Sequence, residues 1–359
     1  MAAKPGGEMI RILHLFNSFQ VGGVERLHAM LVEDLCGEFE QDCWAYNPGQ
    51  LLNELPGLGV STICSGFSEI ARRMTSDKYD CVVMRTHRHI REFLELLEHI
   101  FTPLIYIKDY LRWFQGNDTF WDPEFDGPVH LRANKVFYCG PSLREGVANM
   151  GIQGHDPEMI HHGLRLERFP LRPRTLSGQG SLKVAILANL LPVKNQIAAL
   201  HSMRDMLASG EARLVLGGDC HNLEYATSLR RAAEGLPVTF AGYVADVPGF
   251  LAGVDVLMLA SDQEGWPVAL MEGMACGLPV IAPALGDVPE LLDHGRAGLL
   301  FPPGCHERIP GLLRRLADPA EYARYAAAAV HRVRRLDAAA SAKKVRKAVT
   351  SLVRREAQA

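Results

Sequence analysis

The fold of this chain is decided by residues 261–280, Ser261-Asp-Gln-Glu-Gly-Trp-Pro-Val-Ala-Leu-Met-Glu-Gly-Met-Ala-Cys-Gly-Leu-Pro-Val280. An apolar run at 254–259 precedes this stretch and is typical of a buried strand. Gly265 permits a tight turn, Pro267 suits the first position of a helix, and Gly277 ends that helix before the next apolar run. The pattern therefore predicts strand, loop, helix and strand. It leaves the helix N-terminus open at the carboxyl edge of the first strand, where free N–H groups and the helix dipole favour a phosphate.

Two carboxylates frame that helix N-terminus. Glu264 lies in the loop, and Glu272 lies about two turns along the helix. A carboxylate beside a phosphate is unfavourable unless it accepts hydrogen bonds from hydroxyl groups, which sugars and riboses supply. In the alternative interpretation, Glu264 caps the helix and Glu272 is a solvated surface residue. The pattern favours the first interpretation.

The same segment also resembles a known signature. The pattern S-x-x-E-G-x-P-x-x-x-x-E-x-M-A-C-G-x-P-V, with seven residues between Glu264 and Glu272, is similar to the donor site of retaining GT-B glycosyltransferases of family 4. The resemblance covers most of the chain and is strongest over 182–302. It implies two Rossmann-like, doubly wound parallel-sheet domains that face a cleft. It also implies a nucleotide-diphosphate sugar as co-substrate, with UDP favoured by its frequency in the family, and sugar transfer without a catalytic metal or other cofactor.

Composition excludes several classes of protein. With 359 residues, of which 48% are hydrophobic and 22% charged, the chain is globular and long enough for two or three domains. Its net charge of −3 gives no reason to expect nucleic acid as a partner. The eight Cys are scattered without a C-x-x-C pair, as expected for buried thiols in a reducing compartment. We find no apolar run long enough to span a bilayer, so we expect a soluble cytoplasmic protein that could contact the inner face of a membrane.

The first half of the chain alternates strands with helices. An apolar run at 10–16 leads through a polar loop ending in Gly22-Gly23 to a helix at 24–35. Further strands are predicted at 42–47, 60–64, 81–86, 104–108, 135–139 and 158–161, with helical stretches such as 90–100 and 142–150 between them. This alternation predicts a parallel, doubly wound sheet that binds ligands outside the carboxyl ends of its strands.

The alternation restarts after a stretch at 169–180 that is rich in Pro, Gly and Ser. Strands are predicted at 182–188, 212–217 and 238–240, and helices at 196–207, 223–234 and 247–251. We therefore expect an acceptor-side domain at 1–172, a linker at 173–180 and a nucleotide-sugar-binding domain at 181–335. The resemblance implies that a last helix, at 336–359, packs back on the N-terminal domain. The many Lys and Arg residues of this tail favour a solvated helix face over weak attraction to anionic lipid headgroups.

The loop after the predicted strand 182–188 carries Lys194. The residues Ala188-Asn-Leu-Leu-Pro-Val-Lys194 resemble the family's G-R-L-x-x-x-K loop, which implies that Lys194 neutralises the donor diphosphate. Asn189 replaces the usual Arg, so one cation is missing from the leaving-group site. The alternative is an ordinary exposed loop lysine, and the context favours the functional interpretation.

The resemblance extends to a full set of donor-binding and nucleotide-binding residues. These candidates are Gly22, Gly23, Asn189, Lys194, Gly218, Gly242, Tyr243, Gly265, Trp266, Val268, Ala269 and Glu272. Two of the assignments stay open. The pair Gly22-Gly23 also fits a plain strand–helix turn, and Tyr243 fits the core as well as the nucleotide base.

Ionisable residues also follow the fourth and fifth predicted strands of the first half. The family often has His-Asp after the fifth strand, and this chain has Lys108-Asp109 there. The role of that His therefore passes to Lys108, is filled by His87, or is absent. Weaker candidates for contact with the acceptor are Arg85, Asp109, Arg112 and Trp113, the last of which opens the aromatic and acidic segment 113–125. A self-packed aromatic loop is the alternative for that segment. No spacing in the sequence indicates a metal site.

These observations predict a retaining, metal-independent glycosyltransferase of the EC 2.4 type. Its catalytic candidates are Glu264, Lys194, Lys108 and His87. The acceptor would be a glycan, a lipid-linked sugar or a small molecule. The alternatives are a nucleotide-sugar-binding protein without transfer activity and a GT-B sugar epimerase. The sequence leaves open the base, the sugar, the acceptor, the linkage and the oligomeric state.

Overall fold

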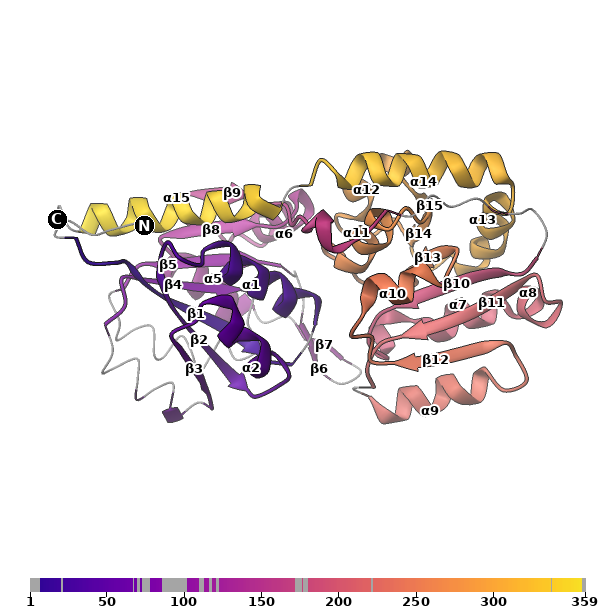
Figure 1. Cartoon of the computed structure of the whole chain (residues 1–359), viewed down its shortest axis with the longest axis horizontal. Coiled ribbons are helices and arrows are strands. Elements are labelled where there is room, and N and C mark those ends of the chain that lie inside the picture. Colours follow the sequence, from indigo (N-terminus) through magenta and orange to yellow (C-terminus); the bar gives the residue numbers. More distant parts are fainter. Residues whose placement is uncertain are drawn as a thin grey trace. The chain divides into compact units, whose positions relative to one another are not determined.

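The computed structural model describes residues 7–20, 22–66, 68–69, 72, 78–85, 102–109, 113–115, 118–120, 123–171, 176, 180–220, 222–336 and 338–356. The chain divides into two compact units (Figure 1). Unit 1 comprises residues 1–113, 120–162 and 338–359, and unit 2 comprises residues 114–119 and 163–337. The main crossings therefore follow His162 and precede Ala338, compared with limits of 172 and 335 in the sequence-based division. Among the described residues, no helix combines the length and apolar character needed to cross a bilayer.

Unit 1 is built on a seven-stranded parallel sheet of order β3-β2-β1-β4-β5-β8-β9. The strands are β1 Arg11–Ser18, β2 Glu40–Asn47, β3 Thr62–Ser65, β4 Cys81–Arg85, β5 Leu104–Lys108, β8 Lys135–Tyr138 and β9 Pro157–Met159. The helices are α1 Gly23–Asp34, α2 Leu51–Glu54, α5 Pro123–Arg132, α6 Pro141–Asn149 and α15 Ala338–Glu356, with a 3-10 turn η1 Leu55–Leu58. Each predicted strand of this half is present, with limits shifted by at most two residues. The helix predicted at 90–100 lies outside the described residues.

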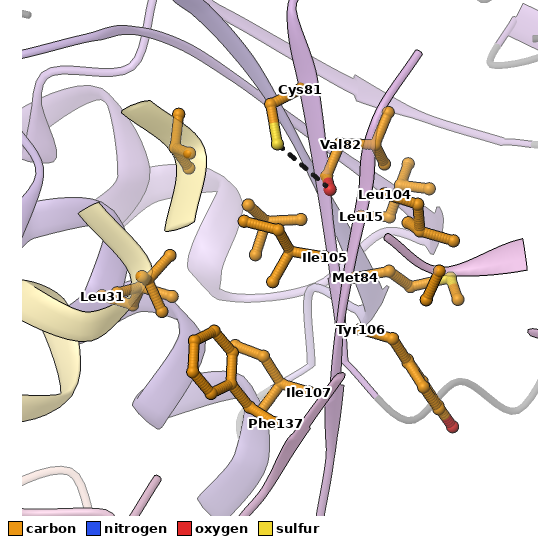
Figure 2. Close-up of a cluster of buried hydrophobic side chains, with 14 of the residues drawn as sticks. Leu15, Leu31, Cys81, Val82, Met84, Leu104, Ile105, Tyr106, Ile107 and Phe137 are labelled. Atoms are coloured by element: carbon orange, nitrogen blue, oxygen red, sulfur yellow. Dashed lines mark hydrogen bonds between the residues drawn. The ribbon is translucent and has the colours of Figure 1, made fainter. Parts of the chain in front are cut away.

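The core of unit 1 lies on both faces of this sheet. Strands β4 and β5 are buried along their whole length, because helices cover both faces of a parallel sheet. Figure 2 shows Leu31 of α1 near Ile105 and Ile107 of β5, and the Cys81 thiol donating a hydrogen bond to the Val82 carbonyl. The same core includes four buried side chains of the last helix, α15, namely Ala342, Val345, Val349 and Val353. The chain end is therefore part of unit 1.

Unit 2 is a second parallel sheet, of order β12-β11-β10-β13-β14-β15. Its strands are β10 Leu182–Leu187, β11 Ala212–Gly217, β12 Val238–Gly242, β13 Val256–Met258, β14 Val280–Pro283 and β15 Leu299–Phe301. Its helices are α7 Gln196–Ser202, α8 Arg204–Ala208, α9 Leu223–Ala232, α10 Val247–Ala252, α11 Val268–Ala275, α12 Val288–Leu291, α13 Ile309–Leu316 and α14 Pro319–Val333. Short 3-10 turns lie at η2 Leu166–Arg168, η3 Pro192–Lys194, η4 Asp293–Gly295 and η5 His306–Arg308. Two parallel-sheet, Rossmann-like units confirm the predicted fold class.

One helix prediction in unit 2 is wrong. The stretch 196–207 forms two helices, α7 and α8, which are separated at Met203. The backbone of Met203 has a ψ of 0°, outside helical geometry, and its side chain is fully buried in the unit 2 core. Apolar periodicity does not reveal such a break, since both halves keep their apolar faces on one core.

Buried polar side chains of β1, α1 and β2 are connected by hydrogen bonds in unit 1. His14 on β1 contacts His28 on α1 through Nδ1 and Nε2 at 3.1 Å, and its Nε2 lies 2.9 Å from Gln41 Oε1 on β2. The Gln41 amide nitrogen donates to the Val32 carbonyl, which directs its oxygen at His14. His14 is therefore a neutral imidazole that donates from Nε2 and accepts at Nδ1. Burial lowers its pKa from 6.5 to about 4.

We expect this histidine to make unfolding depend on pH. Between pH 6.5 and about 4 the unfolded chain binds a proton at residue 14 and the folded chain does not, so stability falls as the pH falls through that window. The loss is at most about 3 kcal/mol for the wild type. Urea unfolding of His14→Gln, with the exposed His155→Gln as control, measures it. Equal pH dependence in wild type and His14→Gln would contradict this assignment.

Candidate functional site

The junction between β13 and α11 presents an open helix N-terminus at the carboxyl edge of the unit 2 sheet. Helix α11 begins at Val268, and Pro267 is the N-cap with extended φ and ψ of −72° and 115°. The predicted position of Pro267 as the first helical residue is therefore wrong by one. No side chain among the described residues caps this end, so the N–H groups of Val268 and Ala269 are available to an anion. Residues 270–275 are buried and anchor the helix in the core.

An ion pair lies beside that helix end. The Lys194 ammonium donates a hydrogen bond to Glu264 Oε1 at 2.8 Å, and the Ser261 hydroxyl donates to the same oxygen at 2.5 Å. The Glu264 side chain is 5% exposed and that of Lys194 is 26% exposed. Glu264 is therefore occupied by two side-chain donors and is not the helix cap, so the capping interpretation is wrong. An ammonium has three N–H groups, which leaves Lys194 the capacity to bind an anion as well.

Two further contacts hold the Lys194 loop against the Glu264 loop. The Asp262 amide donates to the Val193 carbonyl, and the Asn195 side chain donates to Asp262 Oδ1, both at 2.9 Å. Asn195 adopts a left-handed backbone with a φ of 45°, a conformation that Asn tolerates better than most residues do. Lys194 thus stands on a short, clamped turn, which limits how far its ammonium can move.

Asn189 has a structural task in the same loop. Its side-chain oxygen accepts from the Asp219 amide at 3.1 Å, and its carbonyl accepts from the Gln196 side chain at 3.0 Å. Next to it Gly218 has a φ of 150°, and a Cβ there would lie 2.0 Å from the Ala188 carbonyl oxygen. Asn189 therefore connects the loop after β10 to the glycine-bearing turn after β11, at the position where the resemblance implies an Arg. Its contact with a donor stays a prediction.

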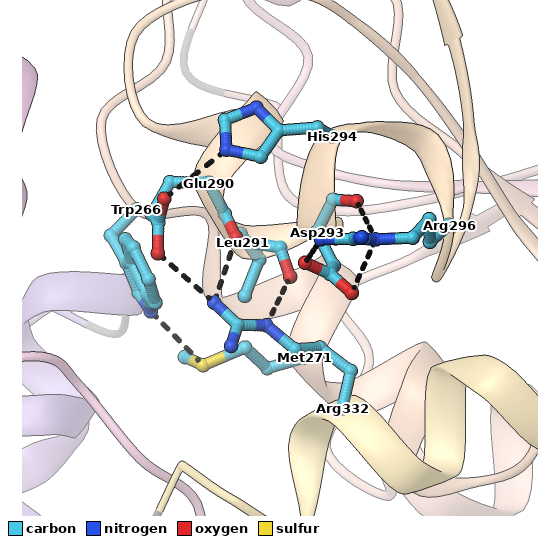
Figure 3. Close-up of polar contacts among 8 residues, drawn as sticks. All are labelled: Trp266, Met271, Glu290, Leu291, Asp293, His294, Arg296 and Arg332. Atoms are coloured by element: carbon cyan, nitrogen blue, oxygen red, sulfur yellow. Dashed lines mark hydrogen bonds and ion pairs between the residues drawn. The ribbon is translucent and has the colours of Figure 1, made fainter.

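The second carboxylate of the signature is buried. Glu272 is 8% exposed on α11, so its interpretation as a solvated surface residue is wrong. Trp266, beside Glu264 and Gly265, is also buried, and its indole N–H donates to the Met271 sulfur at 3.3 Å (Figure 3). The Trp side chain thus fixes the turn into α11.

Gly286, in the turn after β14, packs against the backbone of Glu264. Sequence reasoning missed this contact. Gly286 has a φ of 52°, and a Cβ there would lie 2.1 Å from the Glu264 carbonyl oxygen. The helix that follows, α12, is held by Arg332 of α14, which donates to the backbone carbonyls of Glu290 and Leu291 (Figure 3). In the sequence, Gly286 is an isolated glycine after a predicted strand. The residues next to it do not reveal a contact with Glu264, which lies 22 residues earlier.

The end of β12 and the residue after it carry the two residues predicted near the nucleotide base. Gly242 has a φ of 68°, and its carbonyl accepts from the Gly218 amide at 2.8 Å. Tyr243 is 39% exposed. Its interpretation as a core residue is therefore excluded, and packing against a base stays a prediction.

The candidates of unit 1 lie at the carboxyl edge of its sheet or just beyond the described part. Gly22 is the N-cap of α1 and Gly23 its first residue. Lys108 is fully buried at the end of β5. His87 and Arg112 lie outside the described residues, and only the backbone of Trp113, in the β6 Trp113–Gln115 and β7 Asp118–Phe120 pair, is described. Their roles stay predictions.

Arg85 and Asp109 form a buried network with two residues that the sequence did not single out as ligands. Asp109 Oδ1 accepts from Arg85 at 2.6 Å, from His162 Nε2 at 2.9 Å and from the Cys139 thiol at 3.1 Å. Burial by itself would raise the pKa of Asp109, but Arg85 and His162 hold it below its usual value. Burial lowers the pKa of His162. Asp109 is therefore an ionised carboxylate surrounded by donors.

Comparison with known proteins finds a family match for part of unit 2. Residues 181–319, which run from β10 into α14, match the family of glycosyl transferases group 1. The match covers 139 of the 359 residues and lies within unit 2. The matching segment contains Lys194, Ser261, Glu264, Glu272 and Gly286, so the residues described above belong to the part of the chain that matches.

Relatives and solved structures extend the likeness. The chain is 28% identical over 224 residues to the amylovoran biosynthesis glycosyltransferase AmsK of Erwinia amylovora, covering 59% of this chain and 50% of that protein. It is 33% identical over 211 residues to a GDP-mannose-dependent alpha-mannosyltransferase of Mycobacterium tuberculosis, covering 56% and 52%. The crystal structure of Anabaena Alr3699/HepE with UDP and glucose superposes with a TM-score of 0.82 at 18% identity, covering 96% of this chain and all of that one. The GT-B fold is thus shared, and the chain spans about half the length of these two curated relatives.

The contact of Gly286 with Glu264 can be tested against another glycine with a positive φ that has no atom near its Cβ position. Gly235 has a φ of 74° with no atom near a Cβ. We expect Gly235→Ala to cost about 1 kcal/mol of unfolding free energy from backbone strain alone. Gly286→Ala should cost roughly 2 to 4 kcal/mol, because the Glu264 backbone must also move. Chemical unfolding measures both, and equal costs would show that the Glu264 backbone yields freely.

Proposed function

We propose that the chain is a retaining glycosyltransferase that moves a sugar from a nucleotide-diphosphate sugar to a glycan, a lipid-linked sugar or a small molecule. The observation that supports this most strongly is the contact of Lys194 with Glu264 beside the uncapped N-terminus of α11. A cation, a helix N-terminus and a carboxylate at one sheet edge suit a diphosphate attached to a hydroxyl-bearing ring.

In this proposal unit 2 holds the donor. Lys194 and the N–H groups of Val268 and Ala269 stabilise the diphosphate as it takes up negative charge in the transition state. Glu264 accepts hydrogen bonds from hydroxyls of the donor sugar, and Glu272 accepts them from the ribose. Glu272 lies buried on α11, the helix whose N-terminus would hold the diphosphate, and this position suits contact with the ribose next to that diphosphate.

The transfer itself needs few protein groups. The bond from the anomeric carbon to the phosphate oxygen breaks, the acceptor hydroxyl forms the new bond on the same face, and a leaving phosphate oxygen takes the acceptor proton. No separate general base and no metal are then required for the reaction. Among the residues of unit 1, Gly22, Gly23, Lys108 and His87 remain the candidates for contact with the donor. Arg85, Asp109, Arg112 and Trp113 remain the candidates on the acceptor side.

The donor nucleotide is proposed to be UDP. The structural neighbour HepE binds UDP and glucose, whereas the mycobacterial relative depends on GDP-mannose. In both cases the diphosphate site would be the same. Tyr243 and the Gly242 turn would then lie along the base, where backbone shape decides between nucleotides.

We propose that the protein acts in the cytoplasm at the inner face of a membrane. The outward side of α15 exposes Lys343, Lys347 and Arg354. Cations on one helix side attract anionic headgroups by about 1 kcal/mol each. A lipid-linked acceptor would be reached most directly from there.

Two alternatives keep the fold. Asn189 in place of a cation and Lys108 in place of a histidine both favour a nucleotide-sugar-binding protein without transfer activity. A GT-B sugar epimerase is a weaker alternative, because the two carboxylates of the signature are both present. Slow hydrolysis of the bound donor, measured as released nucleotide, separates a transferase from a protein that only binds.

Removing the charges of the proposed donor site should abolish most transfer. We expect Lys194→Ala to lower kcat by about 10²- to 10³-fold, because the leaving diphosphate loses a cation in the transition state. Glu272→Ala should mainly raise the KM for the donor through loss of ribose binding. Donor turnover, measured as released nucleotide, tests both. Lys183→Ala and Glu234→Ala, exposed positions of the same domain, are the matched controls. Wild-type rates in Lys194→Ala and Glu272→Ala would refute the assignment.

The nucleotide can be identified by thermal unfolding. A ligand that binds only the folded chain raises its stability by about 2.7 kcal/mol at one hundred times its dissociation constant. We expect UDP to raise the melting temperature and ADP or TDP not to. The shift should be absent in Lys194→Ala. A larger shift with GDP would keep the donor site and change the assigned base, whereas no shift with any of the four would contradict donor binding.

A further inference from the structure

Four neighbouring strands of unit 1 bring one polar cluster to the carboxyl edge of the sheet. Arg85 ends β4, Asp109 follows β5, Cys139 follows β8 and His162 lies in the segment after β9. These strands are adjacent and parallel in the order β4-β5-β8-β9, so their carboxyl ends meet at one edge. Side chains 77 positions apart in the sequence thereby converge, although no local spacing connects them.

We propose that Asp109, Cys139 and His162 form a binding site for a thiophilic divalent metal ion of the Zn²⁺ class. One ligand atom from each residue, a carboxylate oxygen, the thiol sulfur and an imidazole nitrogen, lies within 4.8 Å of the other two. Each of the three residues is at most 3% exposed. The cluster is therefore compact and held in place by the surrounding core.

The distances suit a tetrahedral ion after small movements. With bond lengths typical of zinc, ligand atoms of this kind stand about 3.3 to 3.6 Å apart. Asp109 Oδ1 now lies 2.9 Å from His162 Nε2 and 3.1 Å from Cys139 Sγ, as hydrogen bonds require. The atoms need to separate by a few tenths of an ångström. Three protein ligands leave a fourth position for water, and a sulfur ligand selects Zn²⁺ over Mg²⁺ or Ca²⁺.

Arg85 suits the outer shell of such a site. Its guanidinium lies 2.6 Å from Asp109 Oδ1 and is itself buried. Ligating carboxylates are commonly hydrogen-bonded on the side away from the metal, and such partners orient the ligand. Arg85 would then keep its contact with the Asp109 carboxylate while the ion takes the place of the two hydrogen-bonded protons.

The proton balance of binding follows from the hydrogen bonds. The Cys139 thiol loses its proton to solvent and becomes a thiolate. His162 keeps one proton but carries it on Nδ1 instead of Nε2, so that Nε2 can bind the ion. Loading therefore releases about one proton per ion, and affinity rises with pH.

This site goes beyond the proposed transfer reaction, and it assigns Asp109 and Arg85, which are also candidates for acceptor contact, to metal binding instead. Lys194 and Glu264 belong to unit 2, whereas the cluster belongs to unit 1. His162 is the last residue of unit 1 before the chain crosses into unit 2, so a bound ion would tie that crossing to three strand ends. We therefore expect the ion to stabilise unit 1 and not to enter the transfer step.

The test is metal retention by the purified full chain without an affinity tag. The chain is stripped with a chelator, loaded with Zn²⁺, dialysed and analysed by atomic emission. We expect about one Zn²⁺ per wild-type chain, and binding at least about a hundredfold weaker in Cys139→Ser and His162→Gln. The matched controls are Cys43→Ser, another buried thiol of unit 1, and His161→Gln, the exposed neighbour. Both should retain the ion.

A second measurement does not depend on how the variants fold. Co²⁺ in place of Zn²⁺ should give wild type a near-ultraviolet band from charge transfer between thiolate and cobalt, with the visible bands of four-coordinate Co²⁺. Calorimetry in two buffers of different ionisation enthalpy should report about one proton released per ion. A wild type that retains no Zn²⁺, that retains it equally in Cys139→Ser, or that shows no thiolate band would overturn the proposal and leave the cluster a hydrogen-bond network.

Discussion

The contact between Lys194 and Glu264 depends on one topological constraint, the pairing of β10 with β13 in the middle of the unit 2 sheet. Val184 pairs with Val256 in parallel, so the loops that follow the two strands leave the sheet at the same edge and side by side. One loop carries Lys194 and the other carries Glu264, 70 residues later. An ion pair that is partly exposed adds little stability of its own. Its importance is geometric, because it fixes a cation and a carboxylate next to the N-terminus of α11.

The sequence predicted the parts of this arrangement that are local. Buried parallel strands are short apolar runs, and β5 and β11 have the limits predicted for them. Gly277 ends α11 with a φ of 77°, the left-handed conformation that glycine adopts most easily. The errors concern features that are not apparent from the short stretch of sequence around each residue. The helix break at Met203 follows from core packing, and the support of Glu264 by Gly286 joins turns after two different strands.

The candidate residues of unit 1 show even more clearly that contacts between distant residues cannot be predicted from the sequence. Because parallel strands end at one edge, sequence reasoning could place Arg85 and Asp109 together there. It could not find their partners, since Cys139 and His162 lie 30 and 53 residues beyond Asp109. Metal and catalytic motifs are recognised by short spacings within one loop or helix. A cluster assembled from four strand ends has no such spacing, and only the strand order reveals it.

The departure from the family pattern at position 189 bears on how the proposed donor site would work. Without an Arg at position 189, the positive charge at the site comes from Lys194 and from the helix N-terminus, which carries about half an elementary charge. Glu264 shares the Lys194 ammonium in the structure. When hydroxyls of a donor sugar bind Glu264, its hold on Lys194 weakens and the ammonium can turn toward the diphosphate. Under this proposal the sugar and the diphosphate are recognised together, and a donor that lacks the hydroxyls would also lose part of its leaving-group stabilisation.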